Sequence, residues 1–183
     1  MMETTLGDIT LNIVDGVHGD CVSEDNSGYY FISVKDMQDF RIDYTAARQI
    51  TQSEYEKANL RTKLESDDVL FANTGDTIGK MLRITPSTAK IGRTTFQKSV
   101  AILKPDTEKI DPLYFYYLIK YNTPGLRGAA VGSGQKNLLL GDMRTFKLSV
   151  PHESDDQKSI ASILASIDRK IETNAMVNDN LVA

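Results

Sequence analysis

The sequence predicts an α+β protein: a mixed, largely antiparallel sheet domain with short helices, followed by a long C-terminal helix of coiled-coil character. Two observations lead to this fold class. Short stretches rich in aromatic and β-branched residues alternate with turn residues through residues 1–151. From Ser154 onward the apolar residues instead recur at steps of three and four, the period of an amphipathic helix. We therefore expect a globular domain over residues 1–151 and a helix over residues 152–183.

The predicted strands of the globular domain are short and are separated by turn residues. They cover residues 6–13, 29–33, 68–72, 77–84, 94–103 and 146–150, of which the first can also start as a short helix. A turn at residues 73–76 joins two of them into a hairpin, and Pro105 and Pro151 end the last two. Because hairpins connect neighbouring strands in sequence, the sheet is expected to be mainly antiparallel or mixed.

Three short helices are expected inside the globular domain, and each has a recognisable start. Ser53 and Glu56 have the spacing of a capping box, in which each side chain bonds the backbone N–H of the other residue. Asp111 followed by Pro112 places a capping residue before a proline at the first helical position. Pro124 is expected to start a further short helix.

Basic residues are concentrated in the middle of the chain, although the net charge is −4. Residues 1–34 contain six acids and no base, whereas residues 77–105 contain six bases and no acid. Residues 113–147 contain five bases against one acid. Screening limits the reach of a charge to about 10 Å, so a local excess of bases can bind phosphates despite the acidic total. A solvated strand face explains the charge alone equally well.

Composition excludes several classes of protein. The single Cys21 leaves no internal disulfide, and with only two histidines a structural zinc site is not expected. No apolar run is long enough to cross a bilayer, and the N-terminus lacks the features of a secretory signal. We expect a cytoplasmic protein with no metal, no cofactor and no membrane partner. No Gly-x-Ser-x-Gly elbow or amino-methyltransferase motif occurs, so no catalytic residue is predicted.

Two glycine-rich loops are the candidate binding segments. Residues 75–81 resemble a phosphate-binding P-loop, but three residues rather than four separate the glycines, and Met81 replaces the magnesium-binding hydroxyl. A strand is expected where the P-loop needs a helix, so a nucleotide-dependent enzyme is disfavoured. Residues 132–137 offer Gln135 and Asn137, whose amides can bond an adenine edge, beside a lysine that can reach a phosphate. Either loop can also be a plain surface turn.

The terminal helix carries a heptad stripe that favours pairing with another helix. Its members alternate at steps of four and three: Ile160, Leu164, Ile167, Ile171, Asn174, Asn178 and Leu181. Asparagines at such positions set register and partner number at a cost in stability. About 28 helical residues span roughly 40 Å, close to the ~34–36 Å between the half-sites of dimeric DNA readers. The alternative is that the helix packs back onto the domain.

Five segments carry a family resemblance through their order along the chain: Leu6–Ile9, Asp67–Lys80, Gly134–Leu138, Leu148–Pro151 and Gln157–Ile171. Together they resemble the specificity subunit of Type I restriction-modification systems. The resemblance implies a non-catalytic subunit that reads a bipartite DNA site and docks methyltransferase and restriction subunits. The family usually joins two recognition domains, each followed by a helix, whereas this chain has one of each and a shorter helix. The resemblance therefore implies a half-subunit that pairs with a second copy, or a fragment.

The predicted contacts with double-stranded DNA lie in the two loops and in the strand between them. They are Asn73, Thr74, Thr77, Lys80, Arg93, Thr94, Thr95, Lys98, Gln135, Lys136 and Asn137. We expect the four cations in this set to share one concave surface shaped for a duplex. Two alternatives remain. One is an interaction module that docks a methyltransferase without touching DNA, and the other is the disfavoured nucleotide-dependent enzyme.

Overall fold

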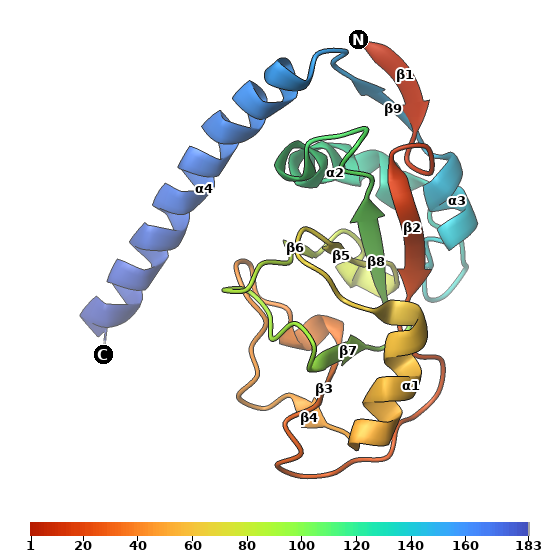
Figure 1. Cartoon of the computed structure of the whole chain (residues 1–183), viewed down its shortest axis with the longest axis vertical. Helices are drawn as coiled ribbons and strands as arrows, with labels where there is room; N and C mark the ends of the chain where they lie inside the picture. The colour runs from red at the N-terminus through yellow and green to blue at the C-terminus, as the bar shows by residue number, and fades with distance from the viewer. Residues whose placement is uncertain (183) are drawn as a thin grey trace.

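Within residues 1–182, three small sheets and the helices packed on them form the body, and one long helix extends from it (Figure 1). This computed structural model describes residues 1–182, and the side chains of residues 1–178. The central sheet has the order β2-β8-β5-β6, formed by Thr10–Asp15, Val100–Pro105, Val69–Ala72 and Met81–Arg83. A second sheet pairs β1 with β9, formed by Met2–Thr5 and Lys147–Val150. The third has the order β4-β3-β7, formed by Arg48–Gln49, Tyr30–Ile32 and Thr94–Phe96.

The pairing of the strands confirms the predicted α+β class with a mixed, largely antiparallel arrangement. β2, β5, β6 and β8 pair antiparallel, as do β1 with β9 and β3 with β4. The exception is β3 with β7, which is parallel. The hairpin predicted from the turn at residues 73–76 is formed by β5 and β6.

Each face of the central sheet covers a separate hydrophobic core. Successive side chains of a strand point to opposite faces, so Val69 and Phe71 of β5 enter one core and Leu70 enters the other. The first core lies between the sheet and a helix that contributes Phe115 and Ile119. The second reaches the third sheet through Ile32 and Phe96. This two-sided burial explains why β5 is a continuous apolar run rather than an alternating one.

The helices of the body begin near the predicted positions, with one correction. α1 (Gln52–Thr62) is capped by Thr51, whose Oγ1 accepts the N–H of Glu54 at 3.3 Å. The capping box predicted at Ser53 is therefore wrong by two residues. α2 (Pro112–Gly128) begins as predicted, because Asp111 Oδ1 accepts the N–H of Tyr114 at 2.8 Å.

α2 does not end where the sequence suggests. It continues through Pro124 to Gly128, so the separate helix predicted to start at Pro124 does not form. The side chains of Asn122 and Thr123 bond the carbonyls one turn earlier and support the turn that the proline weakens. A further short helix, α3 (Leu140–Thr145), follows the second glycine-rich loop and is anchored by the buried Met143. Six residues are too few for a helical period to show in the sequence.

The segment predicted as one strand over residues 94–103 is two strands in different sheets. β7 ends at Phe96, and after a link at residues 97–99 the chain enters the central sheet as β8. The Gln97 N–H donates to the Ile32 carbonyl, and the Val100 N–H donates to the Gln97 carbonyl, so the chain turns here. Strand propensity is similar on both sides of the link, and therefore it does not reveal a change of partner.

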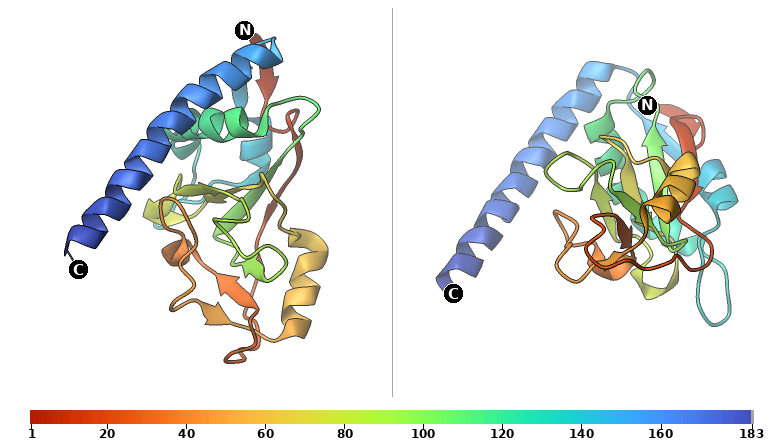
Figure 2. Two further views of the ribbon diagram at one scale, coloured as in Figure 1. Left: turned by 60° about the vertical axis from the view of Figure 1, so that its left-hand side comes forward. Right: turned by 60° about the horizontal axis from the view of Figure 1, so that its bottom comes forward.

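The last helix, α4 (Ser154–Val182), contacts α2 and then runs beyond the body (Figure 2). Ala161 on its second turn is buried, in the core beneath α2. The predicted stripe points elsewhere, and Ile160, Leu164, Ile167 and Ile171 are 37–51% exposed. Asn174 and Asn178 are exposed as well, whereas the side chain of Leu181 lies outside the described residues. Within residues 1–182, no helix is long and apolar enough to cross a membrane.

Candidate nucleic-acid interface

The two candidate loops meet at the end of the central sheet where β5 finishes and β8 begins. The Gly75 N–H donates to the Lys136 carbonyl at 2.7 Å, and the Leu138 N–H donates to the Asn73 carbonyl at 2.8 Å. Gly75 has a φ of +68°, a value that glycine adopts without strain. We call residues 73–77, 97–99 and 134–138 the loop cluster. Its two glycine-rich loops are about sixty residues apart in the sequence, so no local pattern could predict that they meet.

Asn73 holds the loop cluster together from inside. The residue is 7% exposed, and its N–H donates to the Ser99 carbonyl at 3.1 Å. With the amide nitrogen turned toward the link, its side chain donates to the carbonyls of Lys98 and Ser99 at 3.3 and 2.8 Å. A buried amide with these partners cannot also bond a base edge. Asn73, predicted as a DNA contact, therefore has a structural role.

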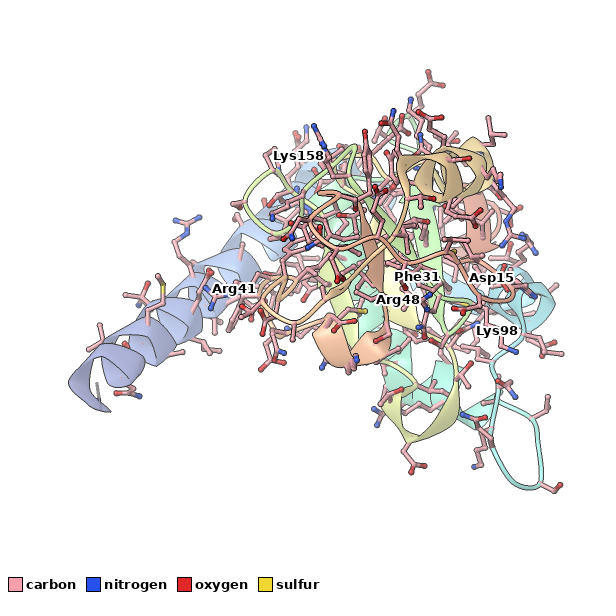
Figure 3. All side chains as sticks on the ribbon, turned by 90° about the horizontal axis from the view of Figure 1, so that it is seen from below. Asp15, Phe31, Arg41, Arg48, Lys98 and Lys158 are labelled. Carbon is pink, nitrogen blue, oxygen red and sulfur yellow. The ribbon has the colours of Figure 1, made fainter. Side chains whose placement is uncertain are left out.

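Six of the predicted contacts are presented at the surface of the loop cluster. Thr77, Lys98, Gln135 and Lys136 are exposed, and Thr74 and Asn137 are half-buried. A pocket of about 410 Å³ lies between the two loops, lined by Gly75, Asp76, Gly134, Gln135 and Lys136. Seen from below, Lys98 lies on the side of the body opposite the end of α4 (Figure 3). These six residues thus offer two cations, two amides and two hydroxyls, with Asp76 as an acid beside them.

Thr94 and Thr95 are not part of this surface. They are 1% and 0% exposed, because β7 lies between β3 and α1. The Thr94 hydroxyl bonds Tyr44 at 2.8 Å, and the Thr95 hydroxyl bonds Thr62 at 3.2 Å. Their polar groups are therefore used inside the protein, and their prediction as DNA contacts is corrected. Polar residues on a strand read as a solvent face in the sequence, and only the position of α1 shows otherwise.

Lys80 and Arg93 lie in other surroundings, so the four predicted cations do not form one concave surface. Lys80 lines a groove of about 370 Å³ together with Lys120 of α2 and Asp168 of α4. The Arg93 guanidinium lies over the Tyr29 ring, 4.9 Å from its centroid. The strand β6 follows Lys80 immediately, as expected, and the segment therefore lacks the helix of a nucleotide-binding P-loop.

Several bases of the two basic segments are bound to groups within the protein. Lys104 Nζ lies 2.7 Å from the buried carboxylate of Asp68, whose pKa is raised by burial despite that pairing. Arg83 pairs with Asp67, and the guanidinium of Arg127 donates to the Ile78 carbonyl. The charges of Lys104 and Arg83 are thus paired with acids inside the protein, whereas Arg127 uses one donor of its guanidinium and stays exposed. The basic segments therefore overstate the positive field at the surface.

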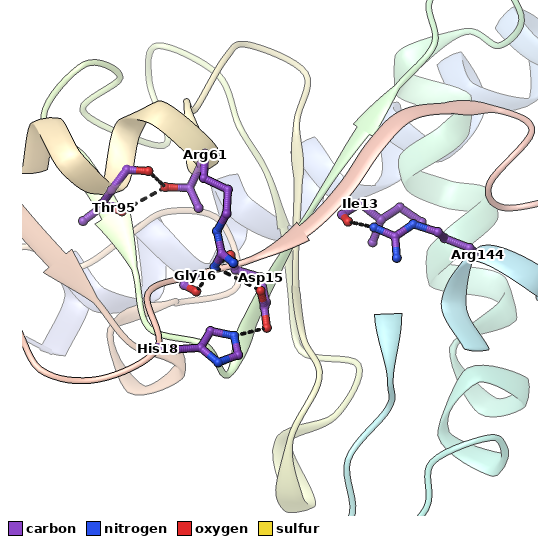
Figure 4. A network of polar contacts seen from close by, with 9 residues as sticks. Ile13, Asp15, Gly16, His18, Arg61, Thr95 and Arg144 are labelled. Atoms are coloured by element: carbon purple, nitrogen blue, oxygen red, sulfur yellow. Dashed lines mark hydrogen bonds and ion pairs between the residues drawn. The ribbon is translucent and has the colours of Figure 1, made fainter. Parts of the chain in front are cut away.

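A polar network beside the loop cluster fixes the end of β2 (Figure 4). Arg61 of α1 donates to the carbonyl of Asp15 at 2.8 Å and to its carboxylate at 3.1 Å. The same carboxylate lies 2.6 Å from Nε2 of His18. The network ties α1 to the segment that packs against residues 96–98, and it thereby supports the position of Lys98.

A model of the family described as Type I restriction modification DNA specificity domain matches residues 19–182. Three solved chains have similar folds. The S subunit of the Type I system from M. genitalium has 13% identity and a TM-score of 0.63, with 95% of this chain and 40% of that chain covered. The HsdS subunit from Thermoanaerobacter tengcongensis has 15% identity and a TM-score of 0.62, with 94% and 38% covered.

The third similar chain comes from work on complex assembly and conformational transition of the type I R-M system. It has 13% identity and a TM-score of 0.63, with 96% of this chain and 44% of that chain covered. The present chain thus spans 38–44% of the length of these solved chains. With the family model covering residues 19–182, the chain belongs to the Type I restriction-modification DNA specificity family and has the fold of its subunits.

Proposed function

We propose that this chain is a non-catalytic module that reads one half of a bipartite DNA target through its loop cluster. Membership of a DNA specificity family supports recognition of DNA sequence. The observation that supports the loop cluster as the DNA-binding site is that backbone hydrogen bonds join the two glycine-rich loops into one exposed polar surface. Loops fixed to a rigid sheet are suited to recognition, because their side chains are held in place before the ligand arrives.

The exposed side chains of the loop cluster match the chemistry of a duplex groove. Gln135 and Asn137 can each donate to and accept from an adenine edge. Lys98 and Lys136 can neutralise phosphates, and the Thr74 hydroxyl can bond either phosphates or bases. The Thr77 hydroxyl donates to the Thr74 carbonyl at 3.0 Å, so it can accept from a base. The acid Asp76 repels a phosphate but can accept from the amino group of cytosine.

The exposed stripe of α4 supports pairing with a second copy of this chain. Four large apolar side chains in one row are costly to leave in water, and a partner helix with the same spacing covers them. Two recognition domains would then be held about one helical turn of DNA apart. Methyltransferase and restriction subunits are the further partners that we propose, in line with the assembled system to which one of the similar chains belongs.

Removal of the two exposed lysines of the loop cluster tests DNA binding. We expect Lys98→Gln with Lys136→Gln to weaken binding to a selected target and to reduce the slope of log affinity against log salt. If each lysine contacts one phosphate, the slope falls by about 1.8. Lys158→Gln, on the first turns of α4, is the matched control and should leave the slope unchanged. Equal slopes in the double variant and the wild type would remove the loop cluster from the interface.

The second candidate function is an interaction module that docks a methyltransferase without touching DNA. The separation of Lys80 and Arg93 from the loop cluster favours it, because fewer cations remain for a single phosphate-binding face. A gel shift with the methyltransferase subunit present separates the two functions. If the chain reads DNA, the Lys98 and Lys136 substitutions weaken the shifted complex. If it only docks the methyltransferase, they leave the shifted complex unchanged.

A further inference from the structure

One side of α4 faces α2 and another faces solvent, which suggests that the two sides have different functions. Gln157 and Ala161 are buried, and Ala165 and Asp168 on the next turns are half-buried. Residues at steps of three and four share one face of a helix, so these four form a line that faces α2. The apolar stripe described above lies on another side and stays exposed. The stripe is therefore free for a partner while the line fixes α4 to the body.

The first attachment of α4 is close to its start. The Gln157 side chain accepts the Asp111 N–H at 2.9 Å and donates to the Pro151 carbonyl at 3.2 Å. Ala161 is 1% exposed and belongs to the core beneath α2. One attachment of this size holds the position of the helix but leaves its direction able to change about that point.

The second attachment lies at Asp168, roughly 16 Å along the helix from Gln157 and roughly 10 Å from Ala161. One carboxylate oxygen of Asp168 accepts from the Tyr117 hydroxyl at 3.1 Å and from Lys120 Nζ at 3.2 Å. Burial of the Tyr117 phenol, followed by the nearby Asp168 charge, raises the pKa of that phenol, so the hydroxyl keeps its proton and donates. The Tyr117 ring is itself held by an edge contact with Tyr116, at 5.1 Å between centroids.

Apolar packing does not fill the space between α4 and the body around this second attachment. A groove of about 470 Å³ opens there, lined largely by polar and charged side chains, among them Arg41, Arg83, Asp168, Arg169 and Glu172. Ala165 packs against the core one turn earlier, and the contact of Asp168 with Tyr117 and Lys120 is the charged connection between α4 and the body beside the groove. Hydrogen bonds to a charged group are stronger than those between neutral groups, so the Asp168 carboxylate can restrain the direction of α4 with few contacts.

We propose that Asp168 is a positioning residue that fixes the direction of α4 relative to the body, and thereby the separation of the two DNA half-sites. The second part rests on the proposed function, whereas the first does not. Two attachments on a rigid helix define its direction, as two points define a line. Loss of the second leaves both the fold of the body and the helix intact but releases the angle between them.

Distance measurements on the full chain test the first part without DNA. Spin labels at Leu60→Cys on α1 and Thr173→Cys on α4, with Cys21→Ala, report the angle by pulsed electron paramagnetic resonance. Labelled chain is diluted into unlabelled chain to suppress distances between copies. For the doubly labelled Cys21→Ala chain we expect one narrow distance distribution. For the same chain with Asp168→Ala we expect a broad distribution, in which the population with α4 docked falls by about tenfold relative to the undocked orientations. An unchanged distribution in Asp168→Ala overturns the proposal.

Two control variants test whether the broadened distance distribution arises from loss of the Asp168 contacts. Asp155→Ala removes the same charge from an exposed position of α4 and should keep the narrow distribution. Tyr117→Phe removes one of the two partners of Asp168 and should broaden it less than Asp168→Ala does. Helix content by circular dichroism should be equal in all variants. Broadening in Asp155→Ala as large as in Asp168→Ala would assign the effect to charge alone and overturn the proposal.

Selection of DNA from a randomised library tests the second part. We expect Asp168→Ala to select the same half-site sequences as the wild type with a wider range of spacer lengths. Affinity for a single half-site should be unchanged, which a general loss of structure would not allow. An equally narrow spacer preference defeats the role in spacing. If the wild type selects no DNA, the proposed function fails, while the distance measurement still decides the role of Asp168 in orientation.

Discussion

Substitution of Ile160, Leu164, Ile167 and Ile171 by Gln is expected to halve the mass of the protein in light scattering. The four side chains are 37–51% exposed, so about half of each remains to be buried by a partner helix. That burial contributes on the order of 1 kcal/mol per side chain, and about 8 kcal/mol over the eight in a symmetric pair. A loss of this size raises the dissociation constant by about six powers of ten.

The body should remain folded in this quadruple variant, because none of the four residues belongs to its cores. The midpoint of denaturant unfolding, followed at the tyrosines of the body, should therefore stay close to that of the wild type. A double variant with Leu11→Gln and Leu60→Gln controls for loss of exposed apolar surface elsewhere. It should keep the larger mass. If the wild type and the quadruple variant have the same mass, α4 does not pair two copies.

Gly16→Ala is expected to destabilise the body by about 3 kcal/mol, near the upper end of typical overpacking effects. A Cβ at this position would lie 2.1 Å from the carbonyl oxygen of Phe96 and 2.3 Å from that of Gln97. Both are backbone atoms, of the last residue of β7 and the first residue of the link to β8, so relief cannot come from a side-chain movement. Relief of the overlap weakens the bond of 2.7 Å from the Val17 N–H to the Phe96 carbonyl.

Denaturant unfolding followed by circular dichroism measures this loss, and Gly141→Ala is the matched control. Gly141 lies in α3 with open space around its Cβ position, so alanine should be neutral or stabilise by up to about 1 kcal/mol. Because Gly16 packs against the segment that carries Lys98, Gly16→Ala should also weaken DNA binding at temperatures where it is folded. A midpoint for Gly16→Ala equal to or above that of the wild type would contradict the close approach.

Local signals predicted much of the fold because the forces behind them act over a few residues. The cap of α2 needs only Asp111 and the N–H of Tyr114, and the burial of β5 follows from four consecutive apolar residues. The failures share another cause. Pro124 remains inside α2 and the segment 94–103 divides between two sheets because distant segments pack there. Tertiary contacts of that kind override local propensity.

The candidate site shows the same division. The sequence identified the two glycine-rich loops and six side chains that the loop cluster presents at its surface. It also included Asn73, Thr94 and Thr95, which are buried, and it did not predict that Tyr117, Lys120 and Gln157 connect α4 to the body. The importance of Asp168 follows from its contact with α2, roughly fifty residues away in the chain, for which the heptad pattern has no signal.

By itself the sequence determined the class of fold, the exposed stripe of α4 and the segments that carry the family resemblance, because periodicity and short motifs are properties of neighbouring residues. Only the tertiary structure decided which bases remain free, since Lys104 and Arg83 are paired with acids that folding brings to them. It also decided which side of α4 faces the body. The residues that pair with a charge or cover a helix face come from segments far away in the chain, and these contacts form only when the chain folds.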